Sequence, residues 1–154
     1  MKYNLLMALS FLLTCNMHCS KVSSEPKSKL VYYDFIQYGM MSYPDKVYRV
    51  YLQPDGKTKL IHNFTNDREE IEIYVPTFVL DSIKCMMGKH KMYQYKSHYT
   101  SSLSIMDGYT WSYTARFEDQ TEFSSNGNNK YPRGNGFQEI HDFLDTYINN
   151  NENE

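Results

Sequence analysis

The sequence predicts an α+β protein with a mostly antiparallel sheet, and three observations carry this prediction. Several short segments alternate apolar and polar residues and are separated by turn residues, which is typical of strands. Two other segments place apolar residues at helical spacing. The strands come in runs instead of alternating singly with helices. We therefore expect two hairpin groups of strands, one helix between them and a C-terminal helix, within a single domain over residues 30–149.

The first group begins with residues 30–38, which are dense in aliphatic and aromatic side chains and end before Gly39. A hairpin is expected over residues 46–64, because a Pro-Asp-Gly-Lys turn at 54–57 divides two strand-forming runs. Proline presets the first turn dihedral and glycine permits a positive φ. Residues 71–75 alternate and predict a third paired strand.

A helix is expected over residues 77–87, because Pro76 suits a helix start and Gly88 suits a helix end. Four residues form its apolar stripe at helical spacing: Val79, Ile83, Met86 and Met87. Residues 89–106 have no clear periodicity and receive no assignment.

The second group contains the clearest alternation, over residues 109–117, and turns back at 118–120 into a strand at 121–125. A last helix opens at Asn135 or Gly136. Its apolar stripe consists of Phe137, Ile140, Leu144, Tyr147 and Ile148. Residues 150–154 form a polar tail.

Residues 1–19 have the pattern of a secretory signal peptide: a basic start, a short apolar run and then small or polar residues. The apolar run is shorter than the roughly 20 residues that a membrane-spanning helix needs. Residues 20–29 are polar and predict a flexible leader. The sequence therefore predicts an exported protein, either in the cell envelope (periplasm or outer membrane, lipid-anchored) or secreted.

Two cysteines in this region are candidates for lipidation, Cys15 and Cys19. The segment 12–15 resembles the bacterial lipoprotein box, although Thr14 replaces the usual Gly, Ala or Ser. Cys19 fits the box less well, but the polar stretch after it looks like the tether of a lipoprotein. A lipid would anchor the domain to a membrane. Cleavage without lipidation is the alternative.

Composition and motifs exclude several classes. The net charge is −2 with acids and bases interspersed, so no nucleic-acid partner is expected. Cys85 alone follows the leader, which gives no disulfide framework and favours a small buried side chain. Four histidines lack metal-ligand spacing and are expected to be satisfied or exposed: His62, His90, His98 and His141. No catalytic residue, metal or cofactor is predicted.

The chain contains fifteen Tyr, eight Phe and one Trp. Trp111, Asn128 and Tyr131 are candidate binding residues, because aromatic faces with amide donors suit sugars or peptides. The same residues also fit a rigid structural corner, in which loop amides satisfy free backbone groups. We favour this structural interpretation and keep the binding site as the alternative.

The corner resembles a pattern in small exported or lipid-anchored bacterial domains of unknown function. The pattern is Asp-Gly-x-x-Trp on a strand, then Ser-x-Gly-x-Asn-x-x-Pro, then a helix that begins with Phe. The matching residues are Asp107, Gly108, Trp111, Ser125, Gly127, Asn129, Pro132 and Phe137. Residues 133–136 lengthen the approach to the helix. The resemblance implies a fold and a compartment, but no activity.

These observations favour a non-catalytic exported domain that binds a protein or glycan partner through its aromatic-rich sheet face. A hydrolase using histidine and carboxylate side chains is one alternative, and an inhibitor or immunity-type protein is another. A hydrolase predicts a cleft in which a histidine lies within about 3.2 Å of Asp or Glu. A binder predicts instead an exposed, contiguous apolar patch of several hundred Å².

Overall fold

The computed structural model describes residues 24–39, 44–64, 70–102 and 108–151. Four parts of the sequence-based predictions lie outside these residues: the signal segment with Cys15 and Cys19, the leader up to residue 23, Asp107 and the end of the polar tail.

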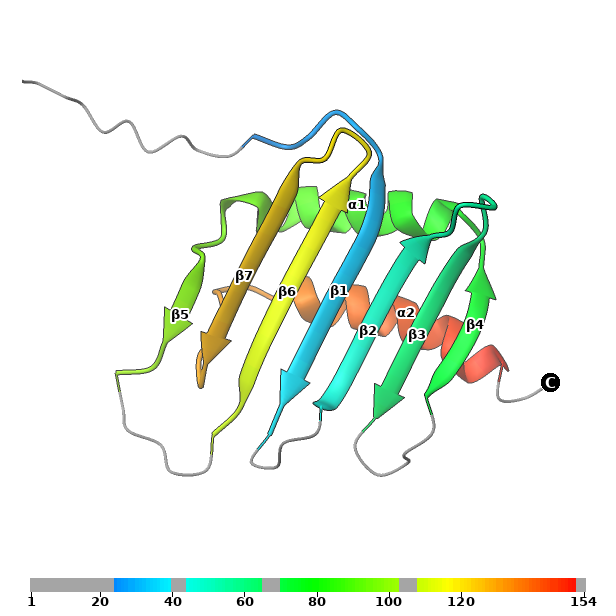
Figure 1. The fold of residues 1–154 in the computed structure, drawn as a ribbon. Coiled ribbons are helices and arrows are strands. Elements are labelled where there is room, and N and C mark those ends of the chain that lie inside the picture. Colours follow the sequence, from blue (N-terminus) through cyan, green and yellow to red (C-terminus); the bar gives the residue numbers. More distant parts are fainter. Residues whose placement is uncertain (1–23, 40–43, 65–69, 103–107, 152–154) are drawn as a thin grey trace, which may run out of the picture.

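The described chain is an α+β fold, in which both helices lie on one face of a seven-stranded sheet (Figure 1). The strand order is β4-β3-β2-β1-β6-β7-β5. All neighbours pair antiparallel except β5 and β7, which are parallel. The strands are β1 (Leu30–Tyr38), β2 (Pro44–Leu52), β3 (Thr58–Phe64), β4 (Ile71–Val75), β5 (His98–Thr100), β6 (Thr110–Phe117) and β7 (Glu122–Asn128).

Strand β1 lies at the centre of the sheet and pairs with both β2 and β6. It places Tyr33 opposite Val50 on one side and opposite Ala115 on the other. The strands before and after α1 are thus parts of one continuous sheet. The expected grouping into two sets of hairpins is not confirmed, because β1 pairs with one strand of each set. Strand β5, in the segment that received no assignment, covers the free edge of β7.

The connection between β2 and β3 is a tight turn in the segment where a hairpin is expected. The pairing runs from Lys46 opposite Phe64 to Leu52 opposite Thr58. Gly56 has φ +84°, a left-handed conformation that glycine adopts without steric cost. The turn proline and glycine therefore set the register of these two strands.

The helices are α1 (Phe78–Lys89) and α2 (Gly136–Asn151), and a short 3₁₀ helix, η1 (Met92–Gln94), follows α1. The face of α1 that contacts the sheet buries Val79, Leu80, Ile83 and Met87. Cys85 is exposed, which corrects the expectation of a buried thiol. Because Cys85 is two residues from both Ile83 and Met87, the helical period turns it away from the sheet.

The aromatic-rich face of the sheet is the face that the helices cover. The largest fully buried side chains include Trp111, Tyr33, Tyr48, Tyr113, Phe35 and Phe117. The opposite face carries ion pairs, including Arg49 with Asp34 at 2.9 Å and Arg116 with Glu122 at 2.7 Å. Within the described residues, no helix is long and apolar enough to cross a membrane.

Candidate functional site

A corner between the end of β7 and the start of β6 is held by three hydrogen bonds. The Trp111 indole Nε1 donates to the carbonyl oxygen of Lys130 at 2.8 Å. The backbone N–H of Tyr109 donates to the side-chain Oδ1 of Asn129 at 2.8 Å. The backbone N–H of Asn129 donates to the carbonyl oxygen of Tyr109 at 2.9 Å. Asn129 has φ +52°, a conformation that asparagine tolerates better than most residues. The loop amide satisfies backbone groups, which is the structural role expected for this corner.

Gly127 makes the close approach at this corner possible. It lies opposite Trp111 in the β6–β7 pairing. A Cβ atom here would collide with the indole nitrogen of Trp111 and would lie 2.6 Å from the carbonyl oxygen of Lys130. The absence of a side chain at position 127 therefore allows the indole and the loop to meet.

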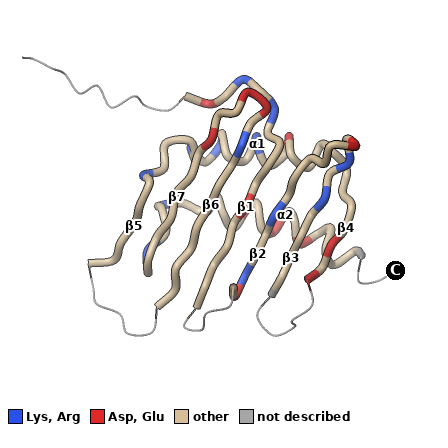
Figure 2. Tube along the Cα trace, viewed as in Figure 1, with Lys and Arg blue, Asp and Glu red and all other residues tan. Residues whose placement is uncertain are grey.

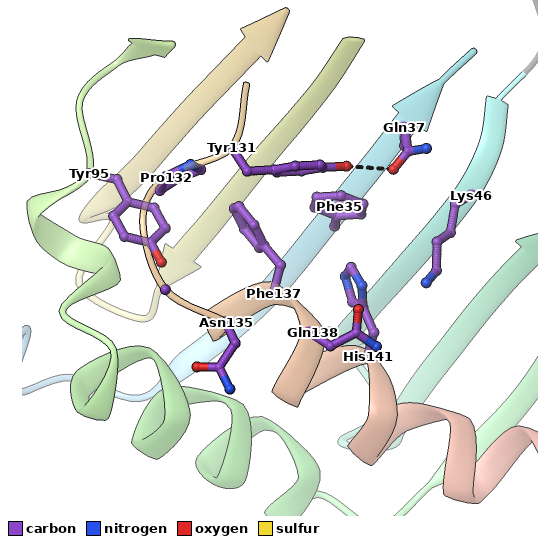
Figure 3. A pocket seen from close by; sticks show the side chains of 11 residues that line it. Phe35, Gln37, Lys46, Tyr95, Tyr131, Pro132, Asn135, Phe137, Gln138 and His141 are labelled. Carbon is purple, nitrogen blue, oxygen red and sulfur yellow. Dashed lines mark hydrogen bonds between the residues drawn. The ribbon is translucent and has the colours of Figure 1, made fainter. Parts of the chain in front are cut away.

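Tyr131 lies over this corner as part of an aromatic stack. Its ring is 5.4 Å from Trp111 at an interplanar angle of 17° and 5.1 Å from Tyr109 at 21°. Its hydroxyl donates to Gln37 Oε1 at 2.5 Å, which connects the loop to β1 (Figure 3). These contacts fix the orientation of the Tyr131 ring.

A pocket of about 370 Å³ opens beside Tyr131, between the sheet, the loop and the start of α2 (Figure 3). We call it the aromatic pocket. Its walls combine aromatic rings, side-chain amides and two basic groups, and no Asp or Glu is among its lining residues. They include Phe35, Gln37, Lys46, Tyr95, Tyr131, Asn135, Phe137, Gln138 and His141.

His141 is the least exposed polar group of the aromatic pocket, with only 3% of its surface accessible. Its ring lies 4.5 Å from that of Phe35, edge to face. Among the described residues, its Nε2 atom has no hydrogen-bond partner. Burial, with smaller effects from Lys46 and His62, lowers the pKa of His141 to about 2. The imidazole is therefore neutral at physiological pH.

A second pocket, of about 470 Å³, adjoins the first, and Tyr95, Tyr131 and Pro132 line both. We call it the basic pocket, because its lining residues include five basic side chains and no carboxylate. These are His90, Lys91, Lys96, Lys130 and Arg133.

The structure brings two of the three predicted binding residues together. Tyr131 lines both pockets, and Trp111 lies beneath it with 1% of its surface exposed. Asn128 is exposed on the opposite face of the sheet, where its Oδ1 accepts a hydrogen bond from Asn129 Nδ2 at 2.7 Å. Strand alternation explains this, since Gly127 and Asn128 must face opposite sides.

Sequence reasoning missed other lining residues, notably Gln37, Lys46 and His141. They come from β1, β2 and α2, which are distant in sequence, so no local spacing signals that they converge. The only local signal was the position of His141 at the edge of the apolar stripe of the last helix.

The other three histidines have partners. His62 Nδ1 lies 3.0 Å from the carbonyl oxygen of Val47, and His98 Nε2 lies 2.6 Å from Thr100 Oγ1. His90 Nε2 lies 2.6 Å from Glu139 Oε2, which meets the distance expected for a hydrolase. Within the described part of the chain, no group of three His, Cys, Asp or Glu residues could hold a metal ion.

The chain matches no model of a known protein family, and no curated protein matches it significantly.

Proposed function

We propose that this protein is a non-catalytic exported domain that binds a glycan in the aromatic pocket. One observation carries the proposal: rigid aromatic rings and side-chain amides converge on one concavity without a carboxylate in its lining. Aromatic faces pack against the C–H faces of sugar rings, and amides donate to and accept from hydroxyls. The volume of about 370 Å³ lies within the usual range for small-ligand sites, about 300–1,000 Å³.

The walls of the aromatic pocket are positioned before a ligand arrives. Tyr131 is held by three ring contacts and by its hydrogen bond to Gln37. Phe137 lies 5.0 Å from Phe35, with the rings tilted by 48°. Fixed walls reduce the entropy lost on binding.

A glycan suits the described surface better than a large protein partner does. The exposed large apolar side chains of the described residues are Leu52 and Tyr74, near the ends of β2 and β4, and Phe78, at the start of α1. The uncovered face of the sheet carries paired charges beside apolar side chains that are half-buried or buried, such as Tyr32 and Ile61. These features support recognition in a concavity.

The hydrolase alternative rests on the contact between His90 and Glu139. Glu139 also accepts hydrogen bonds from Lys89 Nζ, at 2.7 and 2.8 Å to its two oxygens. Hydrogen bonds from Lys89, and to a lesser extent from His90, lower the pKa of Glu139. A nucleophilic mechanism needs a nucleophile within hydrogen-bond reach of the base. Among the described residues, the only side-chain hydrogen bond of His90 is to Glu139, so we favour an ion-pair cluster between α1 and α2.

Glycan binding is tested by isothermal titration of the protein with a panel of neutral oligosaccharides. We expect Tyr131→Ala to weaken binding about tenfold or more, as loss of a central aromatic contact commonly does. Tyr74→Ala is the matched control, because Tyr74 is 64% exposed and lines neither pocket. Near-ultraviolet circular dichroism checks that both variants fold. The proposal fails if no saccharide binds or if the two variants bind equally.

Export and lipid anchoring are tested on the full-length chain in its native host. The intact mass of the membrane fraction should show acyl groups on the cysteine at position 15 or 19. An unmodified protein in the medium would disprove the lipid anchor but would agree with export. Recovery from inside the cell with Met1 still attached would disprove both.

A further inference from the structure

The basic pocket extends the proposed glycan site on the far side of Tyr131. Tyr95, Tyr131 and Pro132 form part of the wall of each pocket, so one extended ligand can contact both. The basic pocket lies between the loop after β7 and the segment from η1 to β5.

Among the described residues, one of the five basic side chains of this pocket, His90, contacts an acid, Glu139, and the other four have no acidic partner. Residues 91–102 and 123–138, which supply nearly all of its lining, contain no Asp or Glu. The Cα trace around β5 accordingly carries no acidic segment in Figure 2. Among the described residues, no carboxylate pairs with the charged groups of Lys91, Lys96, Lys130 or Arg133. Elsewhere, five cations do form such pairs: Arg49, Lys57, Lys59, Lys89 and Arg116.

The backbone of two of these cations is held in place by the core. The carbonyl oxygen of Lys130 accepts the Trp111 indole N–H at 2.8 Å. The carbonyl oxygen of Lys96 accepts a hydrogen bond from the hydroxyl of the buried Ser125 at 2.6 Å. The backbone N–H of Lys96 donates to the Tyr99 hydroxyl at 3.1 Å. Lys91 occupies a left-handed turn with φ +52° between α1 and η1. The cations thus project from a fixed frame, which favours a preorganised anion site.

We propose that the basic pocket binds the anionic group of an acidic saccharide whose adjoining sugar ring occupies the aromatic pocket. This inference rests on the proposed glycan binding and names the class of glycan. A carboxylate and a sulfate share the chemistry that Lys and Arg recognise, namely several acceptor oxygens that carry negative charge. Each accepts charge-assisted hydrogen bonds from lysine and arginine side chains.

The test compares three oligosaccharide probes of similar length by isothermal titration: oligogalacturonate with carboxylates, a heparin-derived fragment with sulfates, and a neutral galactose oligomer. We expect at least one acidic probe to bind about tenfold more tightly than the neutral probe at low salt. The advantage should shrink as sodium chloride is raised, because salt screens exposed charges. The acidic probe that binds identifies the anionic group.

The double variant Lys96→Gln/Arg133→Gln should remove this advantage and change the affinity for the neutral probe far less than that for the acidic probe. Lys27→Gln/Lys29→Gln is the matched control, since it changes net charge equally at two exposed residues that line neither pocket. The inference is overturned if neutral and acidic probes bind equally or if the control variant loses the same affinity. If only neutral binding is found and Tyr131→Ala abolishes it, the glycan proposal stands alone. If no probe binds, both fall.

Discussion

The imidazole of His141 lies flat against the phenol ring of Tyr48, with centroids 4.2 Å apart and 13° between the planes. The hydroxyl of the same tyrosine donates to Asp145 Oδ1 at 2.6 Å, one helical turn further along α2. Two contacts from α2 therefore hold one side chain of β2. They place His141 against the aromatic pocket.

We predict that His141 makes the protein acid-sensitive below pH 6.5. In the unfolded chain a histidine takes up a proton near pH 6.5, whereas burial lowers the pKa of His141 in the folded protein to about 2. The unfolded state binds more protons between these values, so stability falls as the pH falls. The loss between pH 7.5 and 5 should be about 2 kcal/mol for this one group. Urea unfolding at the two pH values measures it.

The variant His141→Phe isolates this effect from other titrations, because it keeps an aromatic ring against Tyr48 and cannot protonate. Its loss of stability over the same pH range should be smaller than that of the wild type by about 2 kcal/mol. His141→Leu serves as a second variant if Phe packs poorly. An unchanged pH dependence in both variants would mean that His141 does not stay neutral on folding.

We predict that Tyr48→Phe lowers the free energy of unfolding by about 1.5 to 3 kcal/mol, the usual worth of a hydrogen bond to a charged group. Burial and the bond to Asp145 both raise the pKa of Tyr48, so its hydroxyl remains a donor. Asp145→Asn keeps an acceptor oxygen and should cost less. Urea unfolding of both single variants and the double variant gives the coupling energy. Additive effects would show that the bond contributes nothing.

For Trp111→Ala we expect a loss of about 3 to 5 kcal/mol, the usual cost of truncating a large buried ring. Trp111 is almost fully buried, and its Nε1 satisfies the Lys130 carbonyl. Trp111→Phe keeps most of the ring and removes only the hydrogen bond, so it should be less damaging. An unchanged thermal midpoint in Trp111→Ala would show that the indole contributes little to the stability of the core. Direct contact with a ligand would then be its main role.

The sequence predicted features that depend on local chemistry. Residues 71–75 form β4 as their alternation indicated, and the β2–β3 turn sits at the Pro-Asp-Gly-Lys segment. The helix expected at 77–87 is observed as Phe78–Lys89. In each case neighbouring residues alone determine the pattern, because turn dihedrals and amphipathic periods are properties of a short window.

Features that depend on distant partners could not be predicted. Strand β5 is only three residues long and forms because β7 offers it a free edge. The aromatic pocket brings together Gln37, Lys46 and His141, whose convergence depends on the order of strands in the sheet. The position of Asn128 depends on a partner too, because the expected strand ended at residue 125, whereas β7 continues to Asn128 and pairs Gly127 with Trp111.

Gly127→Ala should destabilise the protein, because its methyl group would collide with the Trp111 indole and the Lys130 carbonyl. Such overpacking typically costs about 1 to 3 kcal/mol. Ser124→Ala on the same strand is the control, since Ser124 is exposed and should change stability little. Differential scanning calorimetry of the two variants measures the difference. Equal midpoints would show that the indole and the loop can separate without cost.

The contact between His90 and Glu139 distinguishes an ion-pair cluster from a catalytic pair. Because the pKa of Glu139 is lowered on folding, chiefly by Lys89 and then by His90, its contribution to stability is present above the unfolded pKa. That contribution is lost as the pH falls through the native pKa. We therefore expect Glu139→Gln to be less stable than the wild type near pH 7, with the difference vanishing in acid. Urea unfolding at a series of pH values measures the difference, and Glu72→Gln provides a control carboxylate in another ion pair.

A catalytic pair predicts instead that wild-type protein hydrolyses chromogenic ester or glycoside substrates and that Glu139→Gln and His90→Gln both abolish this turnover. Such turnover would replace the binding proposal with a hydrolase, because a structural cluster has no reason to govern a reaction rate.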